Sequence, residues 1–124
     1  MISEAKRAVI LSVEDEFLIR MNAVEMIEEA GFEVVDAASA DEAIAILEAR
    51  LDVTVVFTDI QVPGSMDGLK LAAAVRDRWP PVKIVATSGR VKRGPSDLPQ
   101  GGRFLQKPYS IAEITKILCE LIAA

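Results

Sequence analysis

Short apolar runs alternate along the chain with segments in which apolar residues recur every three or four positions. The runs are rich in β-branched residues and predict five strands, at 8–13, 32–37, 55–59, 82–87 and 104–105. The amphipathic segments predict helices, at 17–30, 39–51, 67–79 and 110–121. This alternation favours a parallel sheet with right-handed crossovers. The expected fold class is therefore α/β, a doubly wound five-stranded parallel sheet in the flavodoxin-like order 2-1-3-4-5.

The predicted helices carry start signals and apolar faces. Ser39 with Glu42, and Ser110 with Glu113, have the spacing of capping boxes, and Asp67 is the expected N-cap of the third helix. The faces expected to cover the sheet are Phe17, Met21, Val24 and Ile27; Ala40, Ala43, Ile44, Leu47 and Leu51; Leu69, Ala72, Val75 and Trp79; and Ile111, Ile114, Leu118 and Leu121.

The stretch 89–103 interrupts the alternation. A helix is expected there, yet the sequence supplies prolines and glycines at high density, namely Gly94, Pro95, Pro99, Gly101 and Gly102. Proline removes a helical hydrogen bond and glycine costs backbone entropy, so this density opposes a regular helix. We therefore predict that the fourth helix is short or irregular, forming a loop or at most one or two turns.

Composition narrows the class of protein. A chain of 124 residues, 51% of them hydrophobic, has the length of one domain and is too apolar to be disordered. A net charge of −5 argues against nucleic-acid binding, and the one basic patch is at 90–93. The single cysteine, Cys119, permits no internal disulfide and fits a cytoplasmic location. The first seven residues resemble neither a signal peptide nor a membrane span.

The chain contains no histidine. This absence excludes catalytic triads that depend on histidine, metal sites with histidine ligands, and phosphohistidine chemistry on the chain itself.

Acidic residues follow the first and third predicted strands. Glu14 and Asp15 come directly after the first strand, and Asp59 ends the third. The expected strand order makes these strands neighbours, with their carboxyl ends at the switch point where ligands collect. Carboxylates that meet there raise one another's pKa values, a conflict that Mg²⁺ resolves. We expect Asp15 and Asp59 as direct Mg²⁺ ligands, the Gln61 backbone carbonyl as a third, and Glu14 acting through water.

Two further polar residues end the fourth and fifth predicted strands. Lys107 is expected to place a positive charge on the oxygens of an incoming phosphoryl group, and Ser88 to donate a hydrogen bond to the same group. Phosphoryl transfer depends mainly on positioning and on neutralising charge, which these residues and Mg²⁺ supply. The predicted product is an acyl phosphate on Asp59.

Taken singly, each of these residues has an ordinary structural interpretation, such as a helix-end acid, a turn or a surface lysine. Together they resemble the receiver domain of two-component response regulators over about residues 8–123. The matching residues, in chain order, are Glu14-Asp15, Asp59, Asp67-Gly68, Ser88-Gly89 and Lys107-Pro108.

The resemblance carries implications of its own. Phosphate is expected to come from a partner histidine kinase or phosphotransfer protein. Ser88 is expected to move toward the phosphate, Phe104 to change rotamer with it, and the Lys107–Pro108 peptide bond to be cis. The chain is then a single receiver domain over 1–124 with no output domain, and it acts on a downstream protein partner not identified by the sequence, without binding nucleic acid or a membrane.

Three departures from the family pattern affect these expectations. Glu14 stands where aspartate is commoner, the loop at 62–67 is one residue longer, and the segment from Ser88 to Lys107 is short and poor in helix. Because the fourth helix belongs to the usual signalling face, we expect output to use an altered region there or to depend more on the first helix.

Three other functions compete with a phospho-accepting switch. A Mg²⁺-dependent phosphatase or nuclease usually pairs acids as Asp-x-Asp, whereas Asp59 is followed by Ile60 and Gln61. A flavodoxin-like carrier of FMN needs a phosphate loop where this chain has three acids. A receiver that binds partners without phosphorylation is disfavoured by the intact acids, Ser88 and Lys107. Beyond its own phosphorylation and hydrolysis of the acyl phosphate, no enzyme activity is expected.

Overall fold

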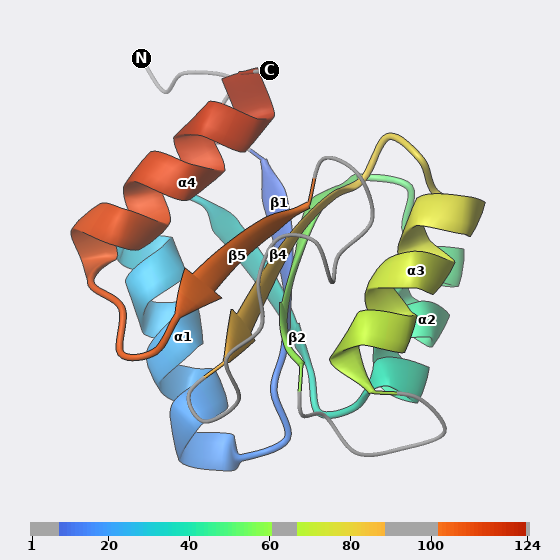
Figure 1. Ribbon diagram of the computed structural model, residues 1–124, viewed down its shortest axis with the longest axis horizontal. Helices are drawn as coiled ribbons and strands as arrows, with labels where there is room; N and C mark the ends of the chain where they lie inside the picture. The colour runs from blue at the N-terminus through green and yellow to red at the C-terminus, as the bar shows by residue number, and fades with distance from the viewer. Residues whose placement is uncertain (1–7, 61–66, 89–101, 124) are drawn as a thin grey trace.

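The computed structural model describes residues 8–60, 67–88 and 102–123. Within these residues a five-stranded parallel sheet in the order β2-β1-β3-β4-β5 forms the centre of the molecule, as predicted (Figure 1). The strands are β1 (Val9–Val13), β2 (Glu33–Ala37), β3 (Val53–Asp59), β4 (Lys83–Ser88) and β5 (Arg103–Gln106). The expectations for Gln61 and for the segment 89–101 lie outside the described residues.

Helices cover both faces of the sheet. They are α1 (Phe17–Glu29), α2 (Ala40–Ala49), α3 (Gly68–Arg78) and α4 (Ile111–Ala123). Figure 1 shows α1 and α4 on one face and α2 and α3 on the other. No helix in the described part of the chain is both long and apolar enough to span a bilayer.

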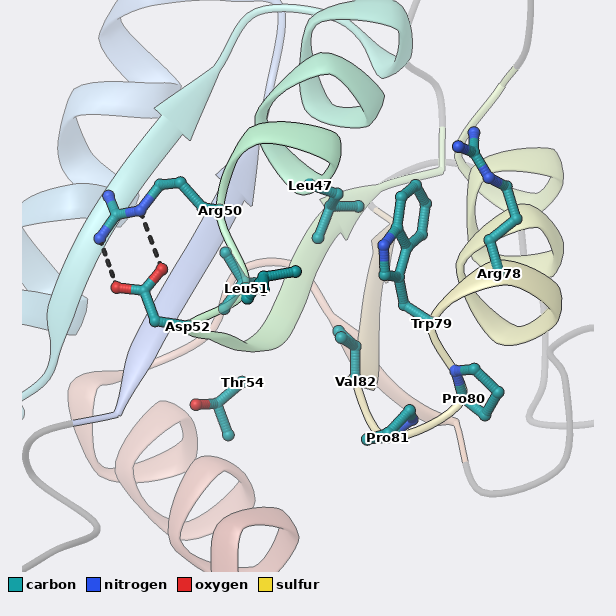
Figure 2. Close-up of a pocket in the computed structure, with 11 residues that line it drawn as sticks. Leu47, Arg50, Leu51, Asp52, Thr54, Arg78, Trp79, Pro80, Pro81 and Val82 are labelled. Atoms are coloured by element: carbon teal, nitrogen blue, oxygen red, sulfur yellow. Dashed lines mark hydrogen bonds and ion pairs between the residues drawn. The ribbon is translucent and has the colours of Figure 1, made fainter.

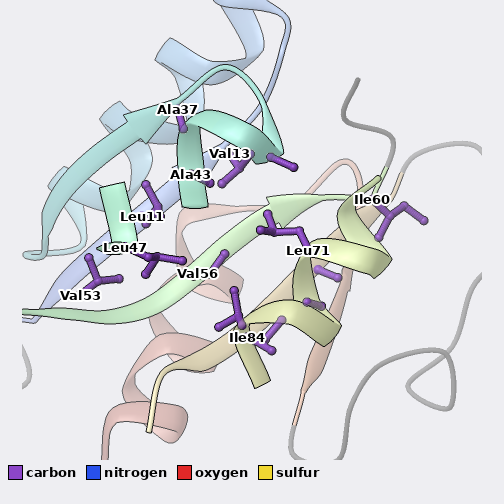
Figure 3. Packing of buried hydrophobic residues seen from close by; sticks show 14 of the residues in the cluster. Leu11, Val13, Ala37, Ala43, Leu47, Val53, Val56, Ile60, Leu71 and Ile84 are labelled. Atoms are coloured by element: carbon purple, nitrogen blue, oxygen red, sulfur yellow. The ribbon is translucent and has the colours of Figure 1, made fainter. Parts of the chain in front are cut away.

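Both faces of the sheet are packed. On the side of α2 and α3, β-branched residues of the central strands interlock with leucines of the helices, among them Leu47, Val56, Leu71 and Ile84 (Figure 3). On the other side, Ile10, Val55 and Val85 pack under α1 and α4 with Ile27, Ile114 and Leu118. Because consecutive residues of a strand point to opposite faces, a strand packed on both sides must be apolar throughout. The uninterrupted apolar run before Asp59 is therefore explained.

Local signals at the helix ends are confirmed. The Asp67 side chain accepts a hydrogen bond from the Lys70 N–H at 2.9 Å. Ser110 and Glu113 form a full capping box, with each side chain accepting from the other residue's N–H. The Ser39 hydroxyl accepts from the Glu42 N–H at 3.2 Å. The Lys107–Pro108 bond is cis, as the resemblance implied.

Two residues expected on covered helix faces are instead exposed. Leu51 is 94% exposed because α2 ends at Ala49 and Arg50 turns into an extended conformation that leads to β3. Phe17 is 61% exposed because it is the first residue of α1, which begins beyond the end of β1. In both cases the apolar periodicity extends beyond the part of the helix that faces the sheet, at the start of α1 and after the end of α2.

The start of α3 lies very close to the end of β3. The Gly68 N–H donates to the Ile60 carbonyl at 3.0 Å. A Cβ at Gly68 would lie 2.5 Å from the Cα of Ile60 and closer still to the carbonyl oxygen of Asp59. Both neighbours are main-chain atoms and cannot rotate away, so only glycine fits at this contact.

We predict that Gly68→Ala destabilises the fold, although alanine is the better helix former. Overpacking against main chain costs about 1–3 kcal/mol, which exceeds the gain in helix propensity of up to about 1 kcal/mol. Urea unfolding followed by the fluorescence of Trp79, the single tryptophan, measures the change. The control is Ala73→Gly at an exposed position of the same helix, which should cost about 0.5–1 kcal/mol. A stabilised Gly68→Ala variant would contradict the close approach.

Candidate functional site

The polar residues predicted to act together lie at one edge of the sheet. Asp59 and Ser88 are the last residues of β3 and β4, while Glu14 and Lys107 directly follow β1 and β5. Since all strands are parallel and these four are consecutive in the sheet, their carboxyl ends meet at the same edge. Topology, rather than nearness in sequence, therefore assembles the candidate site.

Lys107 joins the two buried carboxylates. Its Nζ donates to Asp59 Oδ2 at 2.8 Å and to Glu14 Oε1 at 3.1 Å. Glu14 is only 5% exposed and Asp59 9%. The main chain of Lys107 is also fixed, because its N–H donates to the Ser88 carbonyl at 2.9 Å. One ammonium group thus faces two carboxylates that are largely withdrawn from water.

Within the described residues, one ammonium group serves two buried carboxylates, and the pKa values of Glu14 and Lys107 are shifted as a result. The pKa of Glu14 is raised to about 7, mainly by burial and also by the neighbouring Asp59; the hydrogen bond from the Glu16 N–H and the charge of Lys107 lower this pKa but do not offset the rise. Burial lowers the pKa of Lys107, but its hydrogen bond to Asp59 and the charges of Asp59 and Glu14 outweigh this and raise that pKa above its usual value. The site therefore favours additional positive charge.

The donor set fits a hard divalent cation. Glu14 and Asp59 direct carboxylate oxygens at one point, now held by Lys107. Mg²⁺ prefers oxygen ligands and needs only one or two carboxylates, with water and phosphate completing its shell. Asp15 follows Glu14 and is exposed at the same edge. In the described residues no three acidic, histidine or cysteine side chains form a metal cluster by themselves, so the carboxylates alone do not complete a site.

Ser88 and Phe104 lie on the neighbouring strands. Ser88 is buried and follows Thr87, the residue paired with Asp59 between β4 and β3. Phe104 pairs with Ala86 across β4 and β5, and its ring is partly buried against the cluster under α2 and α3. Both positions suit residues that respond to a change at Asp59, but the rotamer change itself stays a prediction.

The sequence analysis did not predict an aromatic contact that lies next to the site, between Phe57 and Tyr109. The ring of Tyr109 meets the ring of Phe57 edge-on, with centroids 5.7 Å apart and planes at 86°. Phe57 is two residues before Asp59, and Tyr109 is two residues after Lys107. The contact therefore ties the loop that carries Lys107 to the strand that carries Asp59. The position of Tyr109 two residues after Lys107 was the one signal in the sequence that could have indicated a role near the site. Its partner ring, Phe57, is on a strand distant in sequence, so the contact itself could not be predicted.

Two of the hollows on the described surface lie at opposite edges of the sheet. A groove of about 440 Å³ runs between the ends of α2 and α3, with Trp79, Pro80 and Leu47 in its wall and the Arg50–Asp52 ion pair at its rim (Figure 2). It contains no converging carboxylates. A hollow of about 400 Å³ lies beside Lys107, lined by Ile19, Asn22, Lys107, Pro108 and Tyr109. The second hollow opens next to the candidate chemistry.

Comparison with known families gives one match over most of the chain. The sequence profile of the response regulator receiver domain matches residues 10–119. The sensor kinase CckA of Brucella abortus (strain 2308) is 33% identical over 121 residues, which are 93% of this chain and 12% of that protein. The transcriptional regulatory protein PdtaR of Mycobacterium tuberculosis is 32% identical over 114 residues, 85% of this chain and 52% of that protein. The chain thus spans about half, or much less, of the curated relatives it matches.

Solved structures agree with the observed fold. A response regulator receiver protein from Sinorhizobium medicae superposes with a TM-score of 0.87 at 27% identity, covering 95% of this chain and 96% of the other. The response regulator TrrA of Thermotoga maritima, solved in complex with Mg²⁺-BeF, gives a TM-score of 0.81 at 27% identity, with coverage of 92% and 98%.

We predict that the metal-free protein loses stability as pH rises from about 4.5 to about 7. The pKa of Glu14 rises from 4.5 in the unfolded chain to about 7 in the fold. The native state therefore binds this proton more tightly, and deprotonation favours unfolding, by up to about 3 kcal/mol. Urea titrations in the presence of a chelator at several pH values measure the slope. Glu14→Gln should flatten it, whereas Glu25→Gln on the exposed face of α1 should not. An unchanged slope in Glu14→Gln would rule out this residue as the cause.

Proposed function

This chain belongs to the response regulator receiver domain family, and from that premise we propose that it is the phospho-accepting switch of a two-component phosphorelay. In this proposal Asp59 takes a phosphoryl group from a phosphohistidine of a partner histidine kinase or phosphotransfer protein. The observation that carries the proposal is the pairing of a buried Asp59 carboxylate with the Lys107 ammonium at 2.8 Å. If Asp59 only formed a turn or lay on the surface, its carboxylate would need neither burial nor pairing with a lysine.

The proposed reaction uses groups already in place. A carboxylate oxygen of Asp59 attacks phosphorus, the P–N bond of the donor breaks, and its electron pair returns to the imidazole nitrogen. The product is an acyl phosphate. Attack brings two anionic groups together, and the Lys107 ammonium beside the Asp59 oxygen reduces their repulsion. Ser88, at the end of the adjacent strand, is proposed to donate its hydroxyl to the phosphoryl group.

Magnesium is proposed as the second source of positive charge. Asp15 and Asp59 are proposed as its direct ligands, with the Gln61 backbone carbonyl as a third and the buried Glu14 carboxylate acting through water. When bound, Mg²⁺ supplies charge neutralisation and a fixed point for phosphoryl oxygens. The raised pKa of Glu14 supports this assignment, because it shows that the ionised form is costly in this buried position beside Asp59, a cost that a bound cation would lower.

The consequence of phosphorylation is proposed to be a change in partner binding. Movement of Ser88 toward the phosphate frees space that the Phe104 ring then occupies, which alters the surface near β4 and β5. The downstream partner is proposed to be a protein rather than nucleic acid, consistent with a net charge of −5. We further propose that the chain works in the cytoplasm and has no substrate other than its own acyl phosphate.

The donor is proposed to dock on the start of α1. Phe17, Leu18 and Ile19 are 61%, 79% and 37% exposed, directly after the acidic residues of the site. Ile19 also lines the hollow that opens beside Lys107. Large apolar residues exposed together mark a contact surface more often than residues exposed singly. A partner seated here has its phosphohistidine within reach of the edge that carries Asp59.

We predict that the chain takes up phosphate at Asp59. Incubation with a small phosphodonor and Mg²⁺ should add one phosphoryl group to the wild-type chain, seen by intact-protein mass spectrometry. Asp59→Asn should abolish the gain because an amide is not a nucleophile toward phosphorus. Asp77→Asn, at an exposed position of α3, is the matched control and should label normally. Labelling of Asp59→Asn at the wild-type rate would overturn the proposed function.

Substitutions at Leu18 and Leu51 separate docking from chemistry. Leu18→Ser should slow transfer from an autophosphorylated histidine kinase that labels the wild-type chain, on the order of tenfold if Leu18 is a central contact. Labelling by a small phosphodonor should be unchanged, because the site itself is untouched. Leu51→Ser removes an equally large exposed side chain at the opposite edge of the sheet and should leave both rates unaltered. Equal effects of the two substitutions would exclude α1 as the docking face.

A further inference from the structure

Arg20 makes three contacts with one guanidinium group. Its Nη1 donates to the main-chain carbonyl of Glu14 at 2.9 Å, and its Nε donates to Asp36 Oδ2 on β2 at 3.0 Å. Its guanidinium carbon lies 5.6 Å from the centre of the Phe17 ring, within the range of a cation–π contact. The side chain is only 14% exposed. An arginine held on three sides is fixed in orientation.

The carbonyl that Arg20 holds belongs to the peptide group between Glu14 and Asp15. A peptide group is planar, so fixing its oxygen also fixes the direction in which both flanking Cα atoms leave it. Those Cα atoms carry the two acidic side chains expected to serve the metal. The remaining groups of Glu14 are held as well, since its N–H donates to Ala37 at 3.0 Å and its carboxylate contacts Lys107.

We propose that Arg20 is a positioning residue for the acidic loop formed by Glu14 and Asp15, which is expected to bind the metal. In this proposal Arg20 sets the Mg²⁺ affinity of the site by holding the peptide group between these two residues. The proposal rests on the proposed function only in placing Mg²⁺ at this edge. Groups that orient metal ligands from behind typically change metal affinity when they are removed. Arg20 does not touch the expected metal position; it fixes the chain segment from which two ligands extend.

A purely structural role for Arg20 makes a different prediction. The ion pair with Asp36 connects α1 to β2, and loss of that tie alone would lower stability without a specific effect on the metal. Asp36→Asn separates the two roles, because it weakens the ion pair and leaves Arg20 free to hold the Glu14 carbonyl. Arg20→Lys keeps a charge and a donor but lacks the planar fork that serves both partners at once.

The experiment is calorimetric titration of Mg²⁺ alone into the full chain and its variants. Arg20→Met should weaken Mg²⁺ binding on the order of tenfold. Arg20→Lys should recover part of the affinity, and Asp36→Asn should stay within about twofold of wild type because an exposed ion pair contributes little. Unfolding followed by Trp79 fluorescence, without metal, confirms that each variant is folded. If Arg20→Met does not fold, Arg20→Gln carries the same test.

Phosphate uptake is measured separately at limiting and at saturating Mg²⁺. The Arg20→Met variant should label slowly at limiting Mg²⁺ and approach the wild-type rate at saturation, a pattern that a loss of stability does not produce. Wild-type Mg²⁺ affinity in Arg20→Met, or an equal loss in Asp36→Asn, would overturn the proposal, as would a wild-type chain that binds no Mg²⁺. A wild-type chain that binds Mg²⁺ but takes no phosphate would refute the proposed function alone.

Discussion

In the described part of the chain, two buried carboxylates share one ammonium group, and this imbalance of charge governs the candidate site. Removing a carboxylate from water is costly unless it is paired, and a single Lys107 cannot fully compensate both Glu14 and Asp59. The raised pKa of Glu14 is the consequence. A site optimised only for stability would replace one acid with a neutral residue. The presence of both acids is consistent with the proposed function, in which a further cation balances the two carboxylates and the transferred phosphoryl group.

The rest of the fold holds this imbalance in place. The parallel sheet brings the ends of β1, β3, β4 and β5 to one edge. Gly68 lets α3 start directly against the end of β3, and Tyr109 ties the loop of Lys107 to that same strand through Phe57. Arg20, on α1, holds the acidic loop through its hydrogen bond to the main-chain carbonyl of Glu14. Each contact lies a few residues from a charged group, so the scaffold constrains the charges where repulsion would otherwise separate them.

Much of this was predictable because it depends on local pattern or on simple topology. Apolar runs locate buried strands, and alternation with helices determines the strand order that brings Glu14 near Asp59. Capping residues such as Asp67 and Ser110 act within one helical turn, so the sequence alone identifies them. The exposure of Phe17 and Leu51 was mispredicted, because periodicity does not record where a helix stops facing the sheet. Arg20 and Tyr109 escaped notice because their partners are distant in sequence and depend on packing.

The two mispredicted residues show that the role of an exposed apolar side chain depends on where in the fold it lies. Leu51 and Phe17 are both large, apolar and in contact with water, yet they lie at opposite edges of the sheet. Leu51 lines a groove whose rim charges are already paired, Arg50 with Asp52 and Arg78 with Glu48. Phe17 covers the guanidinium that holds the acidic loop. A protein seated on Phe17 therefore also shields Arg20 from water, and lower dielectric strengthens the hydrogen bond that orients the Glu14–Asp15 peptide. The proposed docking face and the acidic loop formed by Glu14 and Asp15 are therefore linked through Phe17 and Arg20.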